Sequence, residues 1–91
     1  MKNEIVIEMI VPYCDDYLNL EWEDDFHIAT SIENGNTIII KADKEGLISL
    51  ARHLLTLAYH PIESHIHFDD FNEILEKGSS ELVLVRKDIW S

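Results

Sequence analysis

The only long helical period in the chain follows Gly46, where apolar residues recur at spacings of three and four. This spacing places them along one side of an α-helix. The stripe consists of Leu47, Leu50, Leu54, Leu57 and Ala58, widened by Ile48, Ala51 and Leu55. Asp43 is a suitable N-cap, and Pro61 ends the helix because it has no backbone N–H to donate. The pattern predicts one main helix, from residue 43 or 44 to residue 59 or 60, packed by this stripe against a sheet.

The segments before the helix alternate between apolar and polar residues, as strands do. Residues 3–11 place Ile5 and Ile7 on one face and Glu4 and Glu8 on the other, and Pro12 ends this first strand. Residues 26–33 and 37–42 then flank Asn34-Gly35-Asn36, a sequence typical of a hairpin turn.

The length of the hairpin loop follows from the register of the two flanking strands. A two-residue loop would mix apolar and polar positions on both faces. A three-residue loop instead opposes Ile32 to Ile38, Thr30 to Ile40 and Ile28 to Ala42. This register gathers the isoleucines on one face, so the sequence predicts the three-residue loop and an apolar face that packs on the core.

Three further elements are expected after the helix. A short strand alternates over residues 65–68, with His65 and His67 opposite Ile66 and Phe68. Asp70 and Glu73 have capping-box spacing, which favours a short helix that ends at Gly78. Residues 81–87 are apolar on both faces and suit a more central strand. The order is strand, strand, strand, helix, strand, short helix, strand. We therefore expect residues 1–91 to form a single α+β domain, an antiparallel sheet of about five strands with the main helix on one face.

Composition narrows the function classes. The chain has 91 residues, one cysteine, and 18 acidic against seven Lys and Arg side chains, for a net charge of −11. This charge disfavours nucleic acid or an anionic membrane as the partner. The start of the chain is a poor signal peptide, and no apolar run approaches membrane-spanning length, so a cytoplasmic protein is expected.

Acidic and aromatic residues are concentrated between Tyr13 and Phe26, and no Lys or Arg lies between Lys2 and Lys41. One interpretation is a solvated loop that keeps the protein soluble. The other is a contact surface for a basic protein, in which aromatic side chains anchor the partner and acids steer the encounter. The candidate partner-binding residues are Asp15, Asp16, Tyr17, Glu21, Trp22, Glu23, Asp24 and Asp25.

Candidate chemistry is sparse. His65 and His67 are spaced so that both could reach one metal ion, but the strand places them opposite Ile66 and Phe68, on the face away from the helix. They are equally explained as a polar strip with Asp69, or as groups that hydrogen-bond into the following turn. Cys14 stands beside two acids, which disfavour a reactive thiolate, and no phosphate-binding loop is present. We therefore expect that the protein is not an enzyme and binds no cofactor.

The run GLISLARHLLTLA, followed by SHIHFDD and LEKGSSELVLVR, resembles the immunity protein 32 family of bacterial polymorphic toxin systems. The resemblance covers roughly residues 35–87 and leaves out the acidic first third of the chain. The matching positions are Gly46, Leu47, Leu50, Ala51, Leu54, Leu57, Ala58, His65, His67, Asp69, Leu75, Gly78, Ser79, Leu82 and Val83.

The resemblance implies a small cytoplasmic protein that binds and neutralises a cognate toxin without catalysis of its own. The family residues His65, His67, Asp69, Gly78 and Ser79 then hold either the fold or the partner. Two alternatives remain open at this point. One is an interaction or structural domain that forms a homodimer through an exposed edge strand. The other is a metal-binding protein or metal-dependent hydrolase that uses His65 and His67.

Overall fold

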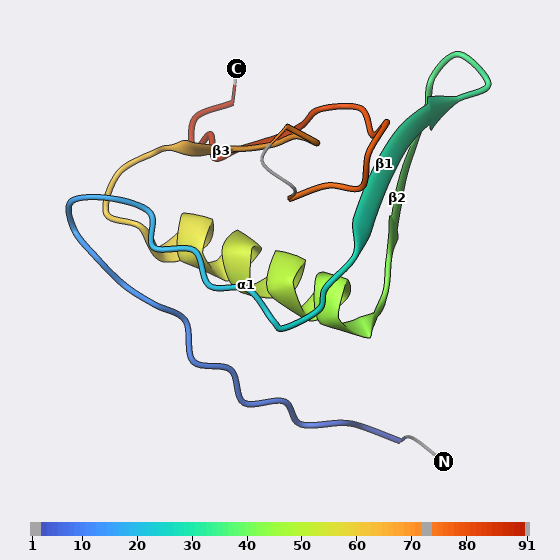
Figure 1. Cartoon of the computed structure of the whole chain (residues 1–91). Coiled ribbons are helices and arrows are strands. Elements are labelled where there is room, and N and C mark those ends of the chain that lie inside the picture. The colour runs from blue at the N-terminus through green and yellow to red at the C-terminus, as the bar shows by residue number, and fades with distance from the viewer. Residues whose placement is uncertain (1–2, 72–73, 91) are drawn as a thin grey trace.

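The computed structural model describes residues 3–71 and 74–90, which form one helix and two small antiparallel sheets (Figure 1). The elements are, in order, β1 (Ile28–Glu33), β2 (Thr37–Ala42), α1 (Lys44–Tyr59), β3 (His65–Phe68) and β4 (Leu82–Val85). β1 pairs with β2, and β3 pairs with β4. The α+β class is confirmed, whereas the expectation of one sheet of about five strands is wrong.

The two sheets stay separate because a loop, residues 76–80, occupies the outer edge of β1. The backbone N–H of Glu76 donates to the carbonyl of Ile28 (2.8 Å), and that of Ser80 donates to Thr30 (3.1 Å). The Thr30 hydroxyl in turn donates to the carbonyl of Ser80. A strand edge that is already bonded in this way cannot accept β4 as a neighbour.

The hairpin has the three-residue loop and the register that the sequence predicts. Ile28 lies opposite Ala42, Thr30 opposite Ile40, and Ile32 opposite Ile38. Its isoleucine face enters the core only at the base, where Ile28 is fully buried, because the hairpin extends beyond α1 (Figure 1). Ile32 and Ile38 are 59% and 72% exposed, so the expectation that the whole face packs on the core is wrong for the outer half.

The helix has the predicted bounds and the predicted cap, but a different buried side. The Asp43 carboxylate accepts from the N–H of Gly46 (2.7 Å), which satisfies a backbone donor of the first turn. Leu50 and Leu57 are buried as expected, whereas Leu47 and Leu54 are 55% and 51% exposed. The buried side consists of Gly46, Ser49, Leu50, His53, Thr56 and Leu57.

Gly46 explains this rotation of the helix. A Cβ atom at this position would lie 2.4 Å from the carbonyl oxygen of His27 and 2.9 Å from Cγ1 of Ile28. Only a residue without a side chain allows α1 to come this close to the base of the hairpin. The contact turns the side of α1 that contains Ser49 and His53 towards the core.

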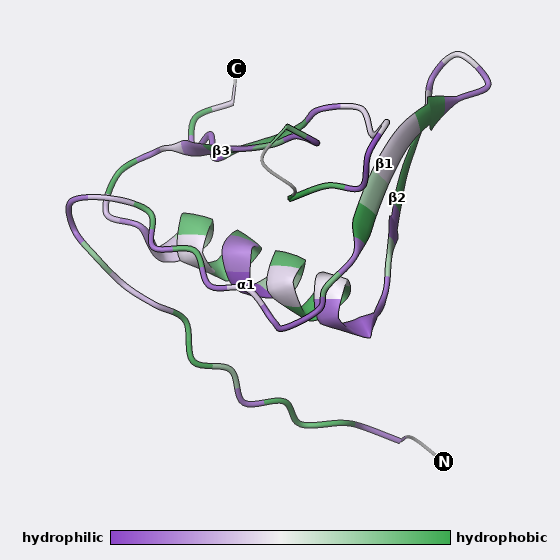
Figure 2. Cartoon of the chain, viewed as in Figure 1, coloured by the Kyte–Doolittle hydropathy of each residue, from purple (hydrophilic) through white to green (hydrophobic). Residues whose placement is uncertain are grey.

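The first expected strand is an elongated segment without strand pairing, residues 3–11, which we call the N-terminal arm (Figure 1). Figure 2 shows the alternation of apolar and polar residues along it. The guanidinium Nε of Arg52 donates to the carbonyl of Ile10 (3.3 Å) and holds the end of the arm beside α1. The expected strand is absent from the described chain because the arm does not reach the edge of either sheet.

A loop takes the place of the expected short helix from Asp70 to Gly78. Its described residues form turns and bends, and Glu73, which would complete the capping box, lies outside the described residues. The Asp70 carboxylate accepts from the N–H of Gly78 (3.0 Å), and the Asp69 carbonyl accepts from the N–H of Leu75 (2.9 Å). Asp69 and Asp70 therefore stabilise a loop through these hydrogen bonds, in place of a helix.

The core lies where α1 meets both sheets and the chain that precedes β1. Its buried members are Ile28, Leu50, Leu57, Ile66, Phe68 and Leu75. Residues 18–26 cover it through Leu18, Leu20, Trp22 and Phe26. In residues 3–71 and 74–90, no helix is long and apolar enough to cross a membrane.

Candidate functional site

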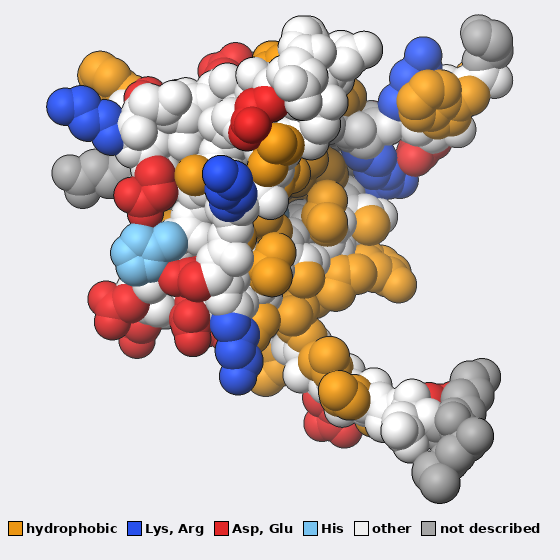
Figure 3. Space-filling model, turned by 90° about the vertical axis from the view of Figure 1, so that its right-hand side faces the viewer, with side chains coloured by type: hydrophobic (Ala, Val, Ile, Leu, Met, Phe, Trp, Pro, Cys, Tyr) orange, Lys and Arg blue, Asp and Glu red, His pale blue; other side chains and the backbone are white. Residues whose placement is uncertain are grey.

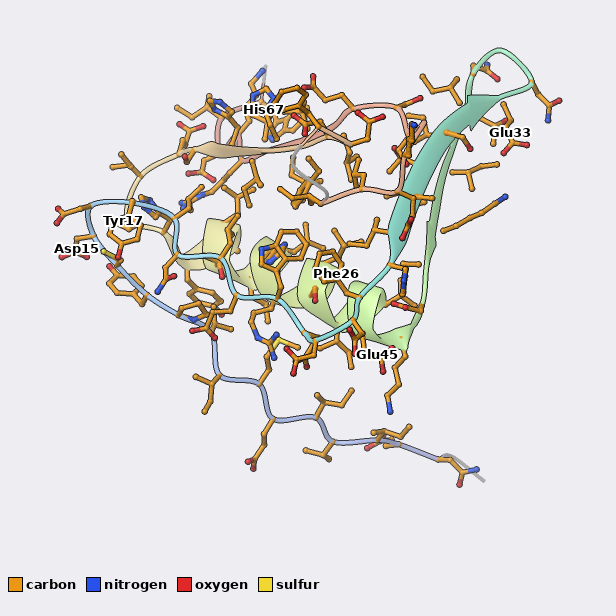
Figure 4. The ribbon with its side chains drawn as sticks, in the orientation of Figure 1. Asp15, Tyr17, Phe26, Glu33, Glu45 and His67 are labelled. Atoms are coloured by element: carbon orange, nitrogen blue, oxygen red, sulfur yellow. The ribbon has the colours of Figure 1, made fainter. Side chains whose placement is uncertain are left out.

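The acidic segment runs along the length of α1. Figure 4 places Asp15 and Tyr17 beside one end of α1 and Phe26 further along the helix, towards the end marked by Glu45. Between them the carbonyl of Glu21 accepts from Nε2 of His53 (3.0 Å), and the N–H of Glu23 donates to the hydroxyl of Ser49 (2.9 Å). These bonds fix the middle of the segment against the helix, so its acids form two groups at opposite ends.

The first group, the Asp15 cluster, consists of Asp15, Asp16 and Tyr17 in a bend of the chain. Both acids are exposed, and Tyr17 is 60% exposed. The neighbouring Tyr13 is 63% exposed, and a hydrogen bond to Asp15 raises the pKa of its hydroxyl. An aromatic side chain beside carboxylates is a suitable anchor for a basic protein surface.

The second group, the Asp25 cluster, begins at the turn of Asp24 and Asp25 and continues across a shallow hollow to Asp43 and Glu76. His27 lies among these acids: its Nδ1 is 2.7 Å from Asp43, and its Nε2 is 4.0 Å from Glu76. The hydrogen bond to Asp43 raises the pKa of His27, and the charges of Asp43, Glu76 and Asp25 act in the same direction. Figure 3 shows acidic side chains gathered on one flank of the molecule.

The sequence did not identify the contact between His27, Asp43 and Glu76. The pairing of His27 with Asp43 could have been predicted, because the hairpin register that opposes Ile28 to Ala42 also brings His27 beside Asp43. Nothing in the sequence pattern places Glu76 there, since it arrives through the loop that occupies the edge of β1.

Trp22 and Glu23, two of the candidate partner-binding residues, make contacts within the chain. The Trp22 ring stacks on Phe26 with centroids 4.5 Å apart and meets His53 edge-on at 4.0 Å. The Glu23 carboxylate lies 3.6 Å from the guanidinium of Arg52. Both residues hold the segment on α1, while Glu21 is exposed beside them.

The motif histidines lie on the outer face of the second sheet. Ile66 and Phe68 are buried, whereas His65 and His67 are exposed, with ring centroids 4.9 Å apart. His67 Nδ1 is 3.7 Å from the carboxylate of Glu81, and Figure 4 shows His67 on the far side of this sheet from α1. The described residues contain no group of three or more His, Cys, Asp or Glu side chains that could hold a metal ion.

The other family positions make loop contacts. The Asp69 carboxylate accepts from the N–H of Phe71 (3.1 Å), as expected for a residue that bonds into the following turn. Gly78 has a φ of +86°, a conformation that favours glycine, and the Ser79 hydroxyl accepts from the N–H of Thr30 (3.2 Å). Asp69 and Gly78 therefore shape the loop, and Ser79 attaches it to β1.

His53 of α1 is fully buried beside Trp22 and Phe68. Burial lowers the pKa of His53 from its usual value of 6.5, so the imidazole is neutral in the folded chain at neutral pH. His60, which follows the last residue of α1, is buried as well.

We expect the lowered pKa of His53 to make the fold sensitive to acid. Below about pH 6.5 the unfolded chain binds a proton on this ring and the folded chain does not, so stability falls as the pH falls. The raised pKa of His27 has the opposite sign: its contribution is complete at low pH and is lost as the pH rises through its folded value. Urea unfolding between pH 5 and pH 8 measures both.

The matched variants are His53→Gln, which keeps a donor for the Glu21 carbonyl, and the exposed His65→Gln. The acid-side slope of stability against pH should flatten in His53→Gln and remain in His65→Gln. An unchanged slope in His53→Gln would contradict the assignment to this ring.

The family model described as immunity protein 32 matches residues 37–87, more than half of the chain. The match covers β2, α1, β3 and β4, and it leaves out the N-terminal arm, the acidic segment and β1. No curated protein and no solved structure matched the chain.

Proposed function

Because the chain belongs to the immunity protein 32 family, we propose that it binds and neutralises a cognate toxin domain of a bacterial polymorphic toxin system, without catalysis of its own. The family match over residues 37–87 carries this proposal. An immunity protein of this kind acts by occupying its toxin, so a surface suited to a protein partner is the feature that it requires.

The two acidic clusters are the surface that we assign to the toxin. Apart from the half-buried Asp43, their carboxylates are exposed, and a net charge of −11 gives the whole chain a field that attracts a basic partner. Tyr13 and Tyr17 add exposed aromatic area at one end of α1. A basic toxin domain that lies along the acidic segment would contact both clusters, with Glu21 between them.

Charge reversal in pairs tests this assignment. Asp15→Lys with Asp16→Lys, and separately Asp24→Lys with Asp25→Lys, should each slow association with the toxin domain about tenfold at low salt, because steering by charge acts on the association rate. The effect should shrink as salt is added, since screening weakens interactions between exposed charges. A toxin domain whose gene lies next to that of this chain is the partner to use, and stopped-flow or surface-based kinetics measures both effects.

The matched control is Glu33→Lys with Glu81→Lys, which changes the net charge equally at exposed sites on the hairpin tip and before β4. Equal slowing by all three pairs would show a general effect of net charge and reject the acidic segment as the site. If the wild-type chain neither binds that toxin domain nor restores growth to cells that express it, the immunity function itself is rejected.

A further inference from the structure

The N-terminal arm has the pattern of a strand but no strand partner. Ile5, Val6, Ile7 and Ile10 are between 74% and 89% exposed. Residues 7–9 border a hollow that Leu47 and Ala51 of α1 also line, and the start of the arm projects away from the rest of the molecule in both Figure 1 and Figure 3. Contiguous exposed apolar side chains of this kind mark interaction sites in folded proteins.

The outer edge of β2 is the complementary feature. In β1 the backbone groups of Ile28 and Thr30 point away from β2, because they bond to the loop of residues 76–80. In an antiparallel pair the residues opposite them share this orientation, so the backbone groups of Ile38, Ile40 and Ala42 point outward from β2. Within residues 3–71 and 74–90, no backbone hydrogen bond to this edge is found. An apolar edge strand of this type is a template for a further strand.

The two faces of the arm match the two faces of β2. On one face, Ile5 and Ile7 would extend the exposed isoleucine surface of Ile32, Ile38 and Ile40. On the other face, Glu8 would lie on the side of Lys41. Apolar and opposite-charge neighbours across strands both stabilise pairing, and the alternation of both strands fixes which faces coincide.

We propose that the N-terminal arm of one copy of this chain pairs with the outer edge of β2 in a second copy, and that the two copies exchange arms around a twofold axis. The exchange pairs the backbone groups of each arm with those of the β2 edge in the other chain, and the same contact occurs twice around the twofold axis. In a single chain the bond from Arg52 to Ile10 holds the arm beside α1, away from β2. The proposal does not involve the toxin and stands apart from the immunity function.

The size of the contact suits a dimer. Ile7 and Met9 of the arm border the same hollow as Leu47 of α1, and Figure 3 shows hydrophobic side chains in a band from the hairpin to the arm. A specific interface needs roughly 800 Å² from each partner, and an arm of nine residues laid on a sheet edge contributes a large part of it.

The first test is the mass of the full chain in solution, by light scattering and sedimentation over a range of concentrations. We expect twice the chain mass for the wild type. Ile7→Pro removes an arm donor and Ile40→Pro removes an outward-facing donor of β2, so both should yield the chain mass. Ile40→Lys keeps the backbone of β2 and should weaken the dimer too. Ile89→Pro, at an exposed site far along the chain, should leave the dimer intact. A wild type that remains a monomer at the highest concentration overturns the proposal.

A cross-linking test distinguishes exchange between copies from pairing within one chain. In a Cys14→Ser background, one chain carries Ile7→Cys and the other carries Ile40→Cys, and the mixture is treated with a short bismaleimide. A product of two chains containing one of each supports the proposal. Efficient linkage only when both cysteines are in the same chain, with the product at the mass of one chain, would mean that the arm closes on its own edge and overturns it.

Discussion

Phe68→Ala is expected to lower the free energy of unfolding by about 3–5 kcal/mol, the usual cost of removing a fully buried phenylalanine ring. Phe68 is 0% exposed, and its ring lies 5.7 Å from that of His53 and 5.9 Å from that of Trp22. It is therefore the point at which β3, α1 and the acidic segment meet. A domain of this size has about 5–15 kcal/mol of stability in total, so the variant should lose a large share of it and unfold at a clearly lower urea concentration.

The control for Phe68→Ala is three residues away. Phe71 is 87% exposed, so Phe71→Ala removes the same ring without leaving a cavity and should change stability by less than about 0.5 kcal/mol. Urea unfolding followed by circular dichroism measures both variants. Equal losses would mean that the ring of Phe68 is not in the core.

Gly46→Ala is expected to destabilise the chain by about 1–3 kcal/mol, the range for overpacking a close contact. The sign is informative, because alanine in a helix interior normally stabilises relative to glycine by about 1 kcal/mol. At Gly46 the added methyl group would lie 2.4 Å from the backbone oxygen of His27, which cannot move without shifting β1. Thermal unfolding of the variant should show a lower midpoint.

The comparison for Gly46→Ala is the reverse exchange at an exposed position of the same helix. Ala58→Gly should cost about 1 kcal/mol through helix propensity alone. If Gly46→Ala instead raises the midpoint, the close approach of α1 to the hairpin does not exist in solution.

The parts of the fold that depend on neighbouring residues followed from the sequence. The register of the hairpin came from the loop Asn34-Gly35-Asn36 and from alternation on either side of it. The helix began after Asp43, where the capping side chain and the first apolar turn agree. The burial of Ile66 and Phe68, and the exposure of the histidines between them, followed from a period of two.

The parts that depend on distant contacts did not follow. The apolar residues of α1 cover so much of its surface that periodicity alone cannot choose the buried side, and the contact of Gly46 with the hairpin decides it. The number of sheets depends on the loop at residues 76–80, which reaches β1 through Glu76 and Ser80. No local pattern indicates that this loop would take the place of a strand.

The candidate site was predicted as one acidic surface and is divided in the structure. Composition located the acids, and the hydrogen bonds of Glu21 and Glu23 to α1 separate them into two clusters. The sequence analysis assigned Trp22 the same partner-binding role as Tyr17, because both are aromatic residues surrounded by acids. Only packing distinguishes the ring that joins the core from the ring that remains exposed.

The position of Trp22 limits how the specificity of this protein can be redesigned. A graft of the whole stretch from Asp15 to Phe26 from another protein would also exchange the ring that covers His53 and Phe68, so a recipient would inherit a stability defect along with a new surface. The side chains of the turns at either end face solvent, so their exchange leaves the core intact, but Asp25 has a φ of +56°, which most residues adopt only at a cost. Libraries for new partners are best confined to Asp15–Tyr17 and Asp24, with Trp22 and Asp25 held constant.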